Sequence, residues 1–189
     1  MGMKISEILA KYETDKINPH GYGDAYDSLL GTFEREDELN ILEIGTQKGG
    51  SLLAWKEYFP NANVVGIDIV DVVPDKYRLD TVTRITSDIK DWRDDTKWDI
   101  VIDDGSHYLG DIVYVVANYI DKLNLNGVLI IEDVRFPELL LSVVENLIID
   151  MKSIKPHLDS SISISVRSYD NRKEETDCSY LLALTKKQT

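Results

Sequence analysis

Cysteine is almost absent from this sequence, because Cys178 is the only one among 189 residues. A single cysteine excludes an internal disulfide framework and any zinc site built from several thiolates. We therefore expect a protein of a reducing compartment, the cytoplasm.

Long hydrophobic runs are missing as well. The longest apolar stretch, within residues 139–149, is interrupted by Glu145 and Asn146. A membrane-spanning helix needs about 20 apolar residues, and the charged N-terminal residues lack the unbroken apolar core of a signal peptide. We expect a soluble protein with no membrane partner.

Positive charge is scarce too. Lys and Arg number 21 against 34 Asp and Glu, which gives a formal net charge of −13. A field of this sign repels phosphate backbones and anionic lipid, so nucleic acid and membrane surfaces are excluded as general partners.

Short runs rich in Val and Ile alternate with longer amphipathic stretches. Four runs are apolar almost to their C-terminal ends, as is typical of strands buried on both faces of a parallel sheet, and a fifth run, 82–87, is weaker and suits a position nearer the edge. The four apolar runs are 40–45, 63–68, 98–103 and 127–132, and the helix-like segments between the strands are 51–58, 108–123 and 137–150. This alternation is typical of a doubly wound α/β sheet.

The C-terminal part has a different pattern. Residues 160–168 alternate polar and apolar side chains, residues 179–185 form a second strand-like run, and the polar link 169–177 predicts a turn or loop. Together they predict an antiparallel hairpin that completes a mostly parallel, seven-stranded sheet. We expect one domain over 1–189, with a helical leader (1–36, helices near 5–12 and 22–30) and a sheet core (37–189).

Two smaller features also carry expectations. Asn126-Gly127 predicts a turn before the strand at 127–132. An exposed apolar face at Leu139–Val144 would favour a homodimer.

Acidic side chains stand at or just after the ends of all five predicted parallel strands. Ligands of open parallel sheets bind beyond these carboxyl ends, so the acids should gather at one edge. The strand ends carry Glu43, Asp68, Asp88, Asp103 with Asp104, and Glu132 with Asp133. Singly, each acid is accounted for as a helix cap or a solvated loop residue; together they favour a ligand rich in hydroxyls, amines or positive charge.

The loop after the first strand, Gly45 to Ser51, is rich in glycine but lacks the G-x-G-x-x-G fingerprint and the P-loop spacing. Glu43 would repel a pyrophosphate, which disfavours a nucleotide-linked oxidoreductase. The loop is either a ligand-binding turn or only a tight strand-to-helix connection that needs glycine.

Asp68 lies at the end of the second strand, where an acidic side chain binds ribose hydroxyls in nucleoside-binding α/β folds. Asp88 could then face an adenine amino group. S-adenosylmethionine combines adenosine with a cationic arm that has no phosphate, and so fits Glu43, Asp68 and Asp88.

A second group of acids predicts a metal site. Neighbouring strands would bring Asp104, Glu132 and Asp133 together, and adjacent carboxylates need a cation to stay ionised. Oxygen ligands favour Mg²⁺, with Mn²⁺ or Ca²⁺ also suitable. His107 could take a proton from a substrate hydroxyl held by that ion, with Asp104 as its catalytic partner. The alternative is that these residues only cap loops and a helix.

The motifs LEIGTQKGGSL, GIDI, SDIKDW, IDDGSH and IIEDV, in this order, resemble the class I S-adenosylmethionine-dependent methyltransferases, which have a Rossmann-like fold. More narrowly, they resemble the metal-dependent sugar O-methyltransferases of macrolide and tetracenomycin-type biosynthesis, and the leader residues Thr14 to Tyr26 resemble the start of that catalytic domain. The resemblance implies that Asp104, Glu132 and Asp133 hold Mg²⁺ and that His107 is the general base. It also implies cofactor contacts, which we expect at Glu43, Gly45, Gln47, Ser51, Asp68, Asp88 and Asp103.

The sequence therefore predicts methyl transfer from S-adenosylmethionine, assisted by a metal, to a hydroxyl of a sugar or glycoconjugate. Two alternatives stay open: a small catechol-like or amine acceptor, and a methyltransferase-like scaffold without activity.

Overall fold

A computed structural model describes residues 2–154, 162–172 and 179–188 and contains one seven-stranded sheet in the order β3-β2-β1-β4-β5-β7-β6. Strands β1 to β5 pair in parallel, and β7 runs antiparallel to both β5 and β6. The strands are β1 (Asn40–Ile44), β2 (Asn63–Asp68), β3 (Val82–Thr86), β4 (Trp98–Asp103), β5 (Leu123–Ile131), β6 (Ile162–Asp170) and β7 (Tyr180–Gln188). The predicted fold class is confirmed, including the weak strand β3 at one edge.

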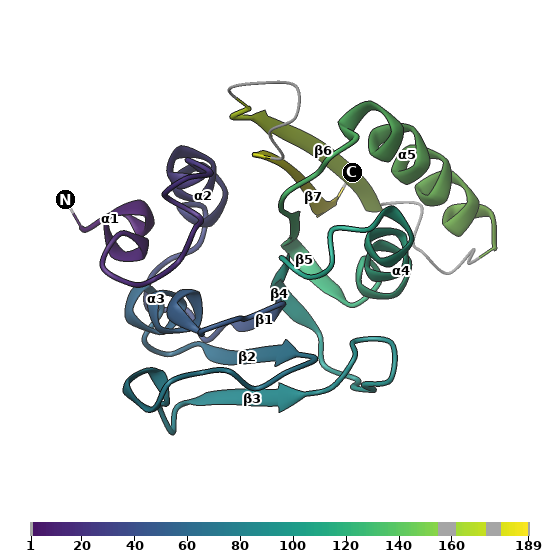
Figure 1. Cartoon of the computed structure of the whole chain (residues 1–189). Coiled ribbons are helices and arrows are strands. Elements are labelled where there is room, and N and C mark those ends of the chain that lie inside the picture. The colour runs from purple at the N-terminus through teal and green to yellow at the C-terminus, as the bar shows by residue number, and fades with distance from the viewer. Residues whose placement is uncertain (1, 155–161, 173–178, 189) are drawn as a thin grey trace.

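Helices cover both faces of the sheet (Figure 1). The helices are α1 (Ile5–Leu9), α2 (Gly23–Leu30), α3 (Gly50–Tyr58), α4 (Leu109–Tyr119) and α5 (Pro137–Ile154), with a short 3₁₀ turn, η1 (Asp75–Tyr77). Alternate residues of the central strands belong to separate hydrophobic clusters, such as Ile41 with α1–α3 and Leu42 with α4–α5. This burial on both faces explains why the sequences of these strands are largely apolar.

Two local expectations need correction. Asn126-Gly127 forms no turn before a strand but lies inside β5, where the register with β4 shifts and Asn126 has a positive φ of 65°. The segment Leu139–Val144 presents no continuous exposed face, because Leu140 and Val144 are buried while Leu139 is half exposed. At Asn126-Gly127 the strand continues through a local turn signal, whereas in α5 Leu140 and Val144 pack into the hydrophobic cluster of α4 and the sheet.

Some predictions lie partly outside the described residues. The predicted strand 160–168 begins before the described part of β6, and most of the predicted link 169–177 and Cys178 are also outside it.

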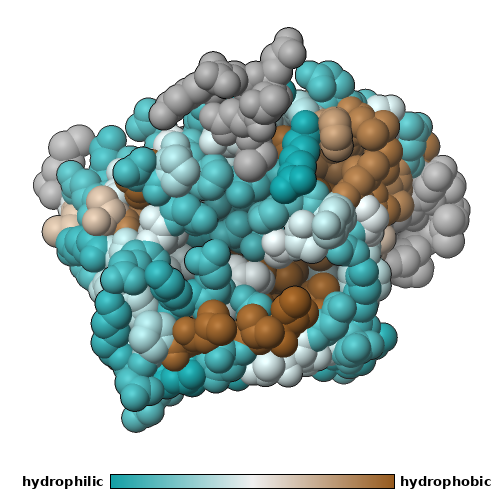
Figure 2. Space-filling view, viewed as in Figure 1, coloured by the Kyte–Doolittle hydropathy of each residue, from teal (hydrophilic) through white to brown (hydrophobic). Residues whose placement is uncertain are grey.

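Within the described residues, no helix is long and apolar enough to cross a membrane. The space-filling view is largely hydrophilic, but apolar side chains gather over α5 (Figure 2). Leu139 and Ile149 of α5 are 50% and 64% exposed.

Candidate active site

The register of the parallel strands brings the acidic strand ends together. Asp103 is the register partner of Ile44 in β1 and of Ile131 in β5. The ladder continues past the strands, because the Asp104 N–H donates to the Ile44 carbonyl at 2.9 Å and the Glu132 N–H to the Asp103 carbonyl at 3.0 Å. The backbone alone therefore fixes Asp104 and Glu132 side by side.

Gly45 makes this close approach of two loops possible. Its φ is +80°, and a Cβ built on it would lie 2.0 Å from the Asp104 carbonyl oxygen. Only glycine fits both the left-handed backbone and the contact, so Gly45 serves the junction of β1 and β4.

One cavity of about 430 Å³ opens at this edge, within the size range of small-molecule sites. Most of the predicted site residues line it, and they come from the ends of β1, β2, β3, β4 and β5. They are Gly45, Gln47, Ser51, Asp68, Asp88, Asp103, Asp104, His107 and Asp133. Glu43 and Glu132 are not among the lining residues, although both were predicted to bind ligands.

Asp68 shapes the glycine-containing loop from the end of β2. Its Oδ2 accepts hydrogen bonds from the Thr46 and Gln47 N–H groups at 2.9 and 2.8 Å, and its Oδ1 accepts one from Val70 N–H at 3.2 Å. Asp88 makes a similar turn contact, since its Oδ1 accepts from the Lys90 N–H at 2.8 Å. Both carboxylates thus face the cavity from backbone-anchored positions.

Asp103 is the most unusual acid of the cavity wall. It is 5% exposed, and its Oδ2 has no hydrogen-bond partner among the described residues. Burial raises the pKa of Asp103 to about 7, although a hydrogen bond from the Gly105 backbone works against the rise. A buried polar atom without a partner is costly, and a donor from a bound ligand would remove that cost.

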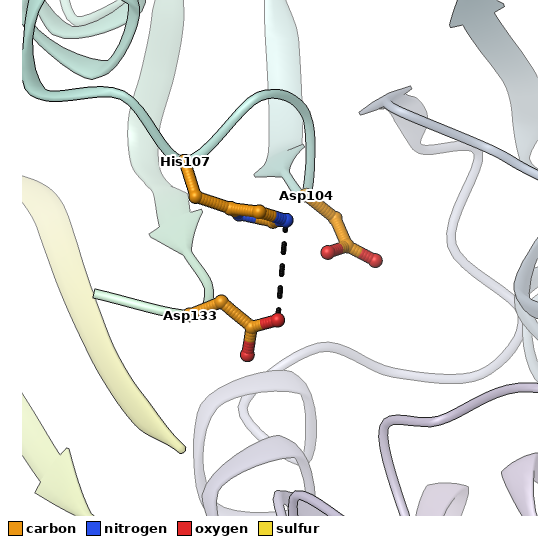
Figure 3. Close-up of side chains that lie close together, drawn as sticks. All are labelled: Asp104, His107 and Asp133. Carbon is orange, nitrogen blue, oxygen red and sulfur yellow. Dashed lines mark ion pairs between the residues drawn. The ribbon is translucent and has the colours of Figure 1, made fainter. Parts of the chain in front are cut away.

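Asp104, His107 and Asp133 form a group that could hold a metal ion. Each offers one ligand atom, and these atoms lie within 4.8 Å of one another. Figure 3 shows the three side chains facing a common space, with His107 Nε2 3.9 Å from Asp133 Oδ2. The two carboxylate oxygens suit Mg²⁺ or Mn²⁺, which prefer oxygen ligands, so Asp104 and Asp133 fit such an ion with the His107 imidazole beside it.

A buried lysine, which the sequence analysis did not assign to the site, joins the carboxylates. Lys16 is 1% exposed, and its Nζ lies 2.7 Å from both Asp104 Oδ2 and Glu132 Oε1 and 3.2 Å from Glu43 Oε1. Burial alone would lower the pKa of Lys16, but the carboxylates outweigh it and hold the pKa above its usual value. In this structure an internal ammonium supplies the cation that clustered carboxylates need.

The same network accounts for the two acids outside the cavity wall. Burial raises the pKa of Glu132 well above its usual value, and Lys16 offsets only part of the rise. Burial likewise raises the pKa of Asp104 to about 6, although the Lys16 ammonium lowers it. Glu43 is fully buried, and its Oε2 accepts from Ser51 Oγ and Trp55 Nε1, each at 2.8 Å. Glu43 therefore accepts hydrogen bonds from two side chains of α3 and contacts the Lys16 ammonium beneath the cavity.

The leader supplies further partners to the predicted metal ligands. The Tyr26 hydroxyl donates to Glu132, and the Tyr22 hydroxyl donates to Asp133 Oδ1 at 2.7 Å. Burial and the Asp133 carboxylate raise the pKa of Tyr22, which keeps this hydroxyl protonated. The polar and aromatic composition of residues 14–26 was the only signal in the sequence for these roles.

Two curated proteins resemble the chain over about two thirds of its length. One, from Streptomyces olivaceus, is "8-demethyl-8-alpha-L-rhamnosyl tetracenomycin-C 2'-O-methyltransferase", 32% identical over 143 residues, or 69% of this chain and 38% of the relative. The other, from Micromonospora griseorubida, is "Mycinamicin VI 2''-O-methyltransferase", 31% identical over 68% of this chain and 35% of the relative. The chain thus spans little more than a third of these relatives' length. No family model matches the sequence.

Solved structures share the fold. The MycE methyltransferase of the mycinamycin biosynthetic pathway, in complex with Mg, SAH and mycinamycin VI, superposes with a TM-score of 0.74 and 23% identity, over 98% of this chain and 55% of that one. A methyltransferase from Pyrococcus furiosus gives a TM-score of 0.58 at 16% identity, over 96% of this chain and 97% of that one. At these identities the likeness concerns the fold alone. The chain therefore has the class I methyltransferase fold, and the predicted resemblance to sugar O-methyltransferases of macrolide and tetracenomycin pathways is confirmed.

Proposed function

We propose that this protein transfers a methyl group from S-adenosylmethionine to a hydroxyl of a sugar or glycoconjugate, with the help of a divalent metal ion. The observation that carries the proposal is the placement of two sets of residues in one cavity. Asp68, Asp88 and Asp103 line the same hollow as the group formed by Asp104, His107 and Asp133. A cofactor at the first set would lie beside a reacting hydroxyl at the second.

The cofactor part of the cavity suits adenosine with a cationic arm. Asp68 stands at the end of β2, where it can bind ribose hydroxyls, and Asp88 stands at the end of the neighbouring strand. The Asp103 oxygen without a partner offers an acceptor to an ammonium group. Gly45, Gln47 and Ser51 complete this wall, and we propose that they contact the cofactor directly.

We propose that Asp104 and Asp133 hold the ion. Glu132 lies next to this position, because its carboxylate and that of Asp104 both contact the Lys16 ammonium. A bound Mg²⁺ would lower the pKa of a hydroxyl that it coordinates. Backbone hydrogen bonds at the strand ends hold these carboxylates in place, so an acceptor hydroxyl at the ion would lie at a fixed position beside the cofactor. Such positioning contributes strongly to the rate of a two-substrate reaction.

His107 is the group that we propose removes the proton. As the acceptor oxygen forms its bond to the methyl carbon, the carbon–sulfur bond breaks and its electron pair stays on sulfur, giving S-adenosylhomocysteine. His107 Nε2 takes the hydroxyl proton and passes it to solvent, which its 23% exposed side chain reaches. Asp133 Oδ2, 3.9 Å away, would stabilise the imidazolium that forms.

The acceptor class rests on the relatives and on one exposed side chain. The name of one relative states a rhamnosyl tetracenomycin as the acceptor, and the name of the other states mycinamicin VI. Tyr108, next to His107, lines the cavity and is 71% exposed, so it offers an aromatic face to a sugar ring at the mouth. The same face would also suit a small catechol-like or amine acceptor, which is the alternative.

We also propose a homodimer, which two separate exposed apolar side chains of α5, Leu139 and Ile149, support. Multi-angle light scattering should give twice the mass of one chain; the mass of one chain would contradict this proposal. A cytoplasmic location, which the lone cysteine supports, is proposed with it.

The test is turnover with a panel of acceptors: a rhamnosylated polyketide, a catechol and an aromatic amine. With S-adenosylmethionine and Mg²⁺, we expect release of S-adenosylhomocysteine with the glycoside and none in excess chelator. Asp104→Ala should abolish this activity, whereas the control Asp80→Ala, at an exposed position away from the cavity lining, should not change it. Methylation of the catechol or amine alone would select the alternative acceptor class, and turnover unaffected by chelator would remove the metal.

A further inference from the structure

Asp133 adopts a backbone conformation that residues other than glycine rarely adopt. Its φ is +53°, in the left-handed region, and His107 across the cavity has a φ of +57°. Such conformations cost free energy, and they persist where the surrounding structure holds them in place. At Asp133, a neighbouring group must therefore hold this backbone conformation in place.

The Tyr22 hydroxyl contacts Asp133 twice. It donates to Asp133 Oδ1 at 2.7 Å and accepts a hydrogen bond from the Asp133 backbone N–H at 3.2 Å. One oxygen atom therefore fixes both the backbone and the side chain of the same residue. With Oδ1 engaged on this side, Oδ2 is left facing His107 and the space shared with Asp104 (Figure 3).

Tyr22 is itself held rigidly. Its side chain is fully buried, and its backbone N–H donates to the Lys16 carbonyl at 2.7 Å. The His20 ring stacks on it with centroids 5.5 Å apart and an interplanar angle of 11°, and His20 Nδ1 lies 3.4 Å from Asp133 Oδ1. The leader therefore presents a preorganised donor to Asp133.

We propose that Tyr22 is a positioning residue: its hydroxyl locks Asp133 in the left-handed conformation that directs Oδ2 toward the metal position. The inference rests on the proposed function, because it needs the ion that Asp104 and Asp133 are proposed to hold. Partners behind a metal ligand orient it, and their loss typically weakens metal binding by about 10–100-fold. His20 Nδ1 lies nearer to Ser179 Oγ, at 2.9 Å, than to Asp133 Oδ1, so its restraint on the same oxygen is the weaker one.

The test compares Tyr22→Phe with Tyr119→Phe, a control that removes a hydroxyl from a buried tyrosine in the other hydrophobic cluster. Mn²⁺ binding is followed by the electron paramagnetic resonance signal of free Mn²⁺, and S-adenosylhomocysteine binding without metal by calorimetry. We expect Tyr22→Phe to raise the Mn²⁺ dissociation constant at least about tenfold, and to leave the affinity for S-adenosylhomocysteine unchanged. Tyr119→Phe should change neither, and His20→Ala should raise the Mn²⁺ constant less than Tyr22→Phe does.

Three other results would contradict the role of Tyr22 or the metal site on which it depends. Wild-type affinity for Mn²⁺ in Tyr22→Phe would overturn the inference and leave the metal site standing. Equal losses of Mn²⁺ and S-adenosylhomocysteine binding, with a melting temperature far below that of Tyr119→Phe, would make Tyr22 a merely structural residue. Absence of Mn²⁺ binding in the wild-type protein would overturn the proposed metal site itself.

Discussion

Replacing Lys16 by Met removes the ammonium that, among the described residues, lies between the carboxylates of Glu43, Asp104 and Glu132. Methionine has a similar length and no charge, so the change isolates the ammonium from the packing of the side chain. Removal of one partner from a buried ion pair costs about 3–5 kcal/mol, because the remaining charge stays buried without compensation. For a domain of this size, about 1 kcal/mol corresponds to roughly 2–4 °C, so we expect the melting temperature to fall by about 6–20 °C at pH 8.

The loss should depend on pH in a defined direction. Burial already raises the pKa of Glu132 and Asp104 in the folded protein, and removal of the ammonium should raise both further. An acid whose pKa is higher in the folded than in the unfolded protein stabilises the fold at pH values below its unfolded-state pKa. This stability is lost as the pH rises through its folded-state pKa. The difference between Lys16→Met and the wild-type protein should therefore be small at pH 5 and large at pH 8.

The assay is thermal and urea unfolding at both pH values in the presence of chelator. Lys11→Met is the matched control, because Lys11 pairs with Glu57 at the surface, where both side chains are more than one-third exposed. An exposed pair contributes about 0–1 kcal/mol. Equal stability of Lys16→Met and Lys11→Met at pH 8 would contradict the role of Lys16 as a stabilising counter-cation of the buried carboxylates.

Three further predictions concern the same edge of the sheet. Burial raises the pKa of Asp103 to about 7 and that of Asp104 to about 6, so the melting temperature in chelator should fall as the pH rises from 5 to 8; a rise over this range would contradict the direction of both shifts. Gly45→Ala should reduce the melting temperature strongly or prevent folding, whereas Gly110→Ala, whose Cβ meets nothing within 4 Å, should be tolerated; circular dichroism of both variants checks this. His107→Ala should retain S-adenosylhomocysteine and Mn²⁺ binding but lose turnover, and a loss of Mn²⁺ binding would make His107 a metal ligand instead of the base.

The fold was predictable because its signals are local. Strands buried on both faces need continuous apolar runs such as those of β1 and β4, and the alternating pattern at 162–168 marks β6 as antiparallel. The cluster of acids at the strand ends followed from the rule that parallel strands end at one edge. The Asn126-Gly127 signal failed because β5 accommodates it as an irregularity, which depends on pairing with a distant strand.

The interior of the site was not predictable in the same way. Lys16 is 88 residues from Asp104 and 116 from Glu132, and no local pattern indicates that a lysine will be buried. The two-fold contact of Tyr22 with Asp133 likewise depends on how the leader packs over the sheet. Glu43 and Glu132 were recognised as important acids, but only tertiary structure places them with Lys16 beneath the cavity surface.

The most direct test of the methyltransferase function is calorimetric titration of the wild-type protein with S-adenosylmethionine and S-adenosylhomocysteine, each with and without Mg²⁺, and with NAD as the comparison ligand. We expect binding of both sulfur compounds and none of NAD, with a further heat from Mg²⁺ that is lost in Asp104→Ala. Failure of both sulfur compounds to bind would contradict the methyltransferase function and favour a scaffold with this fold.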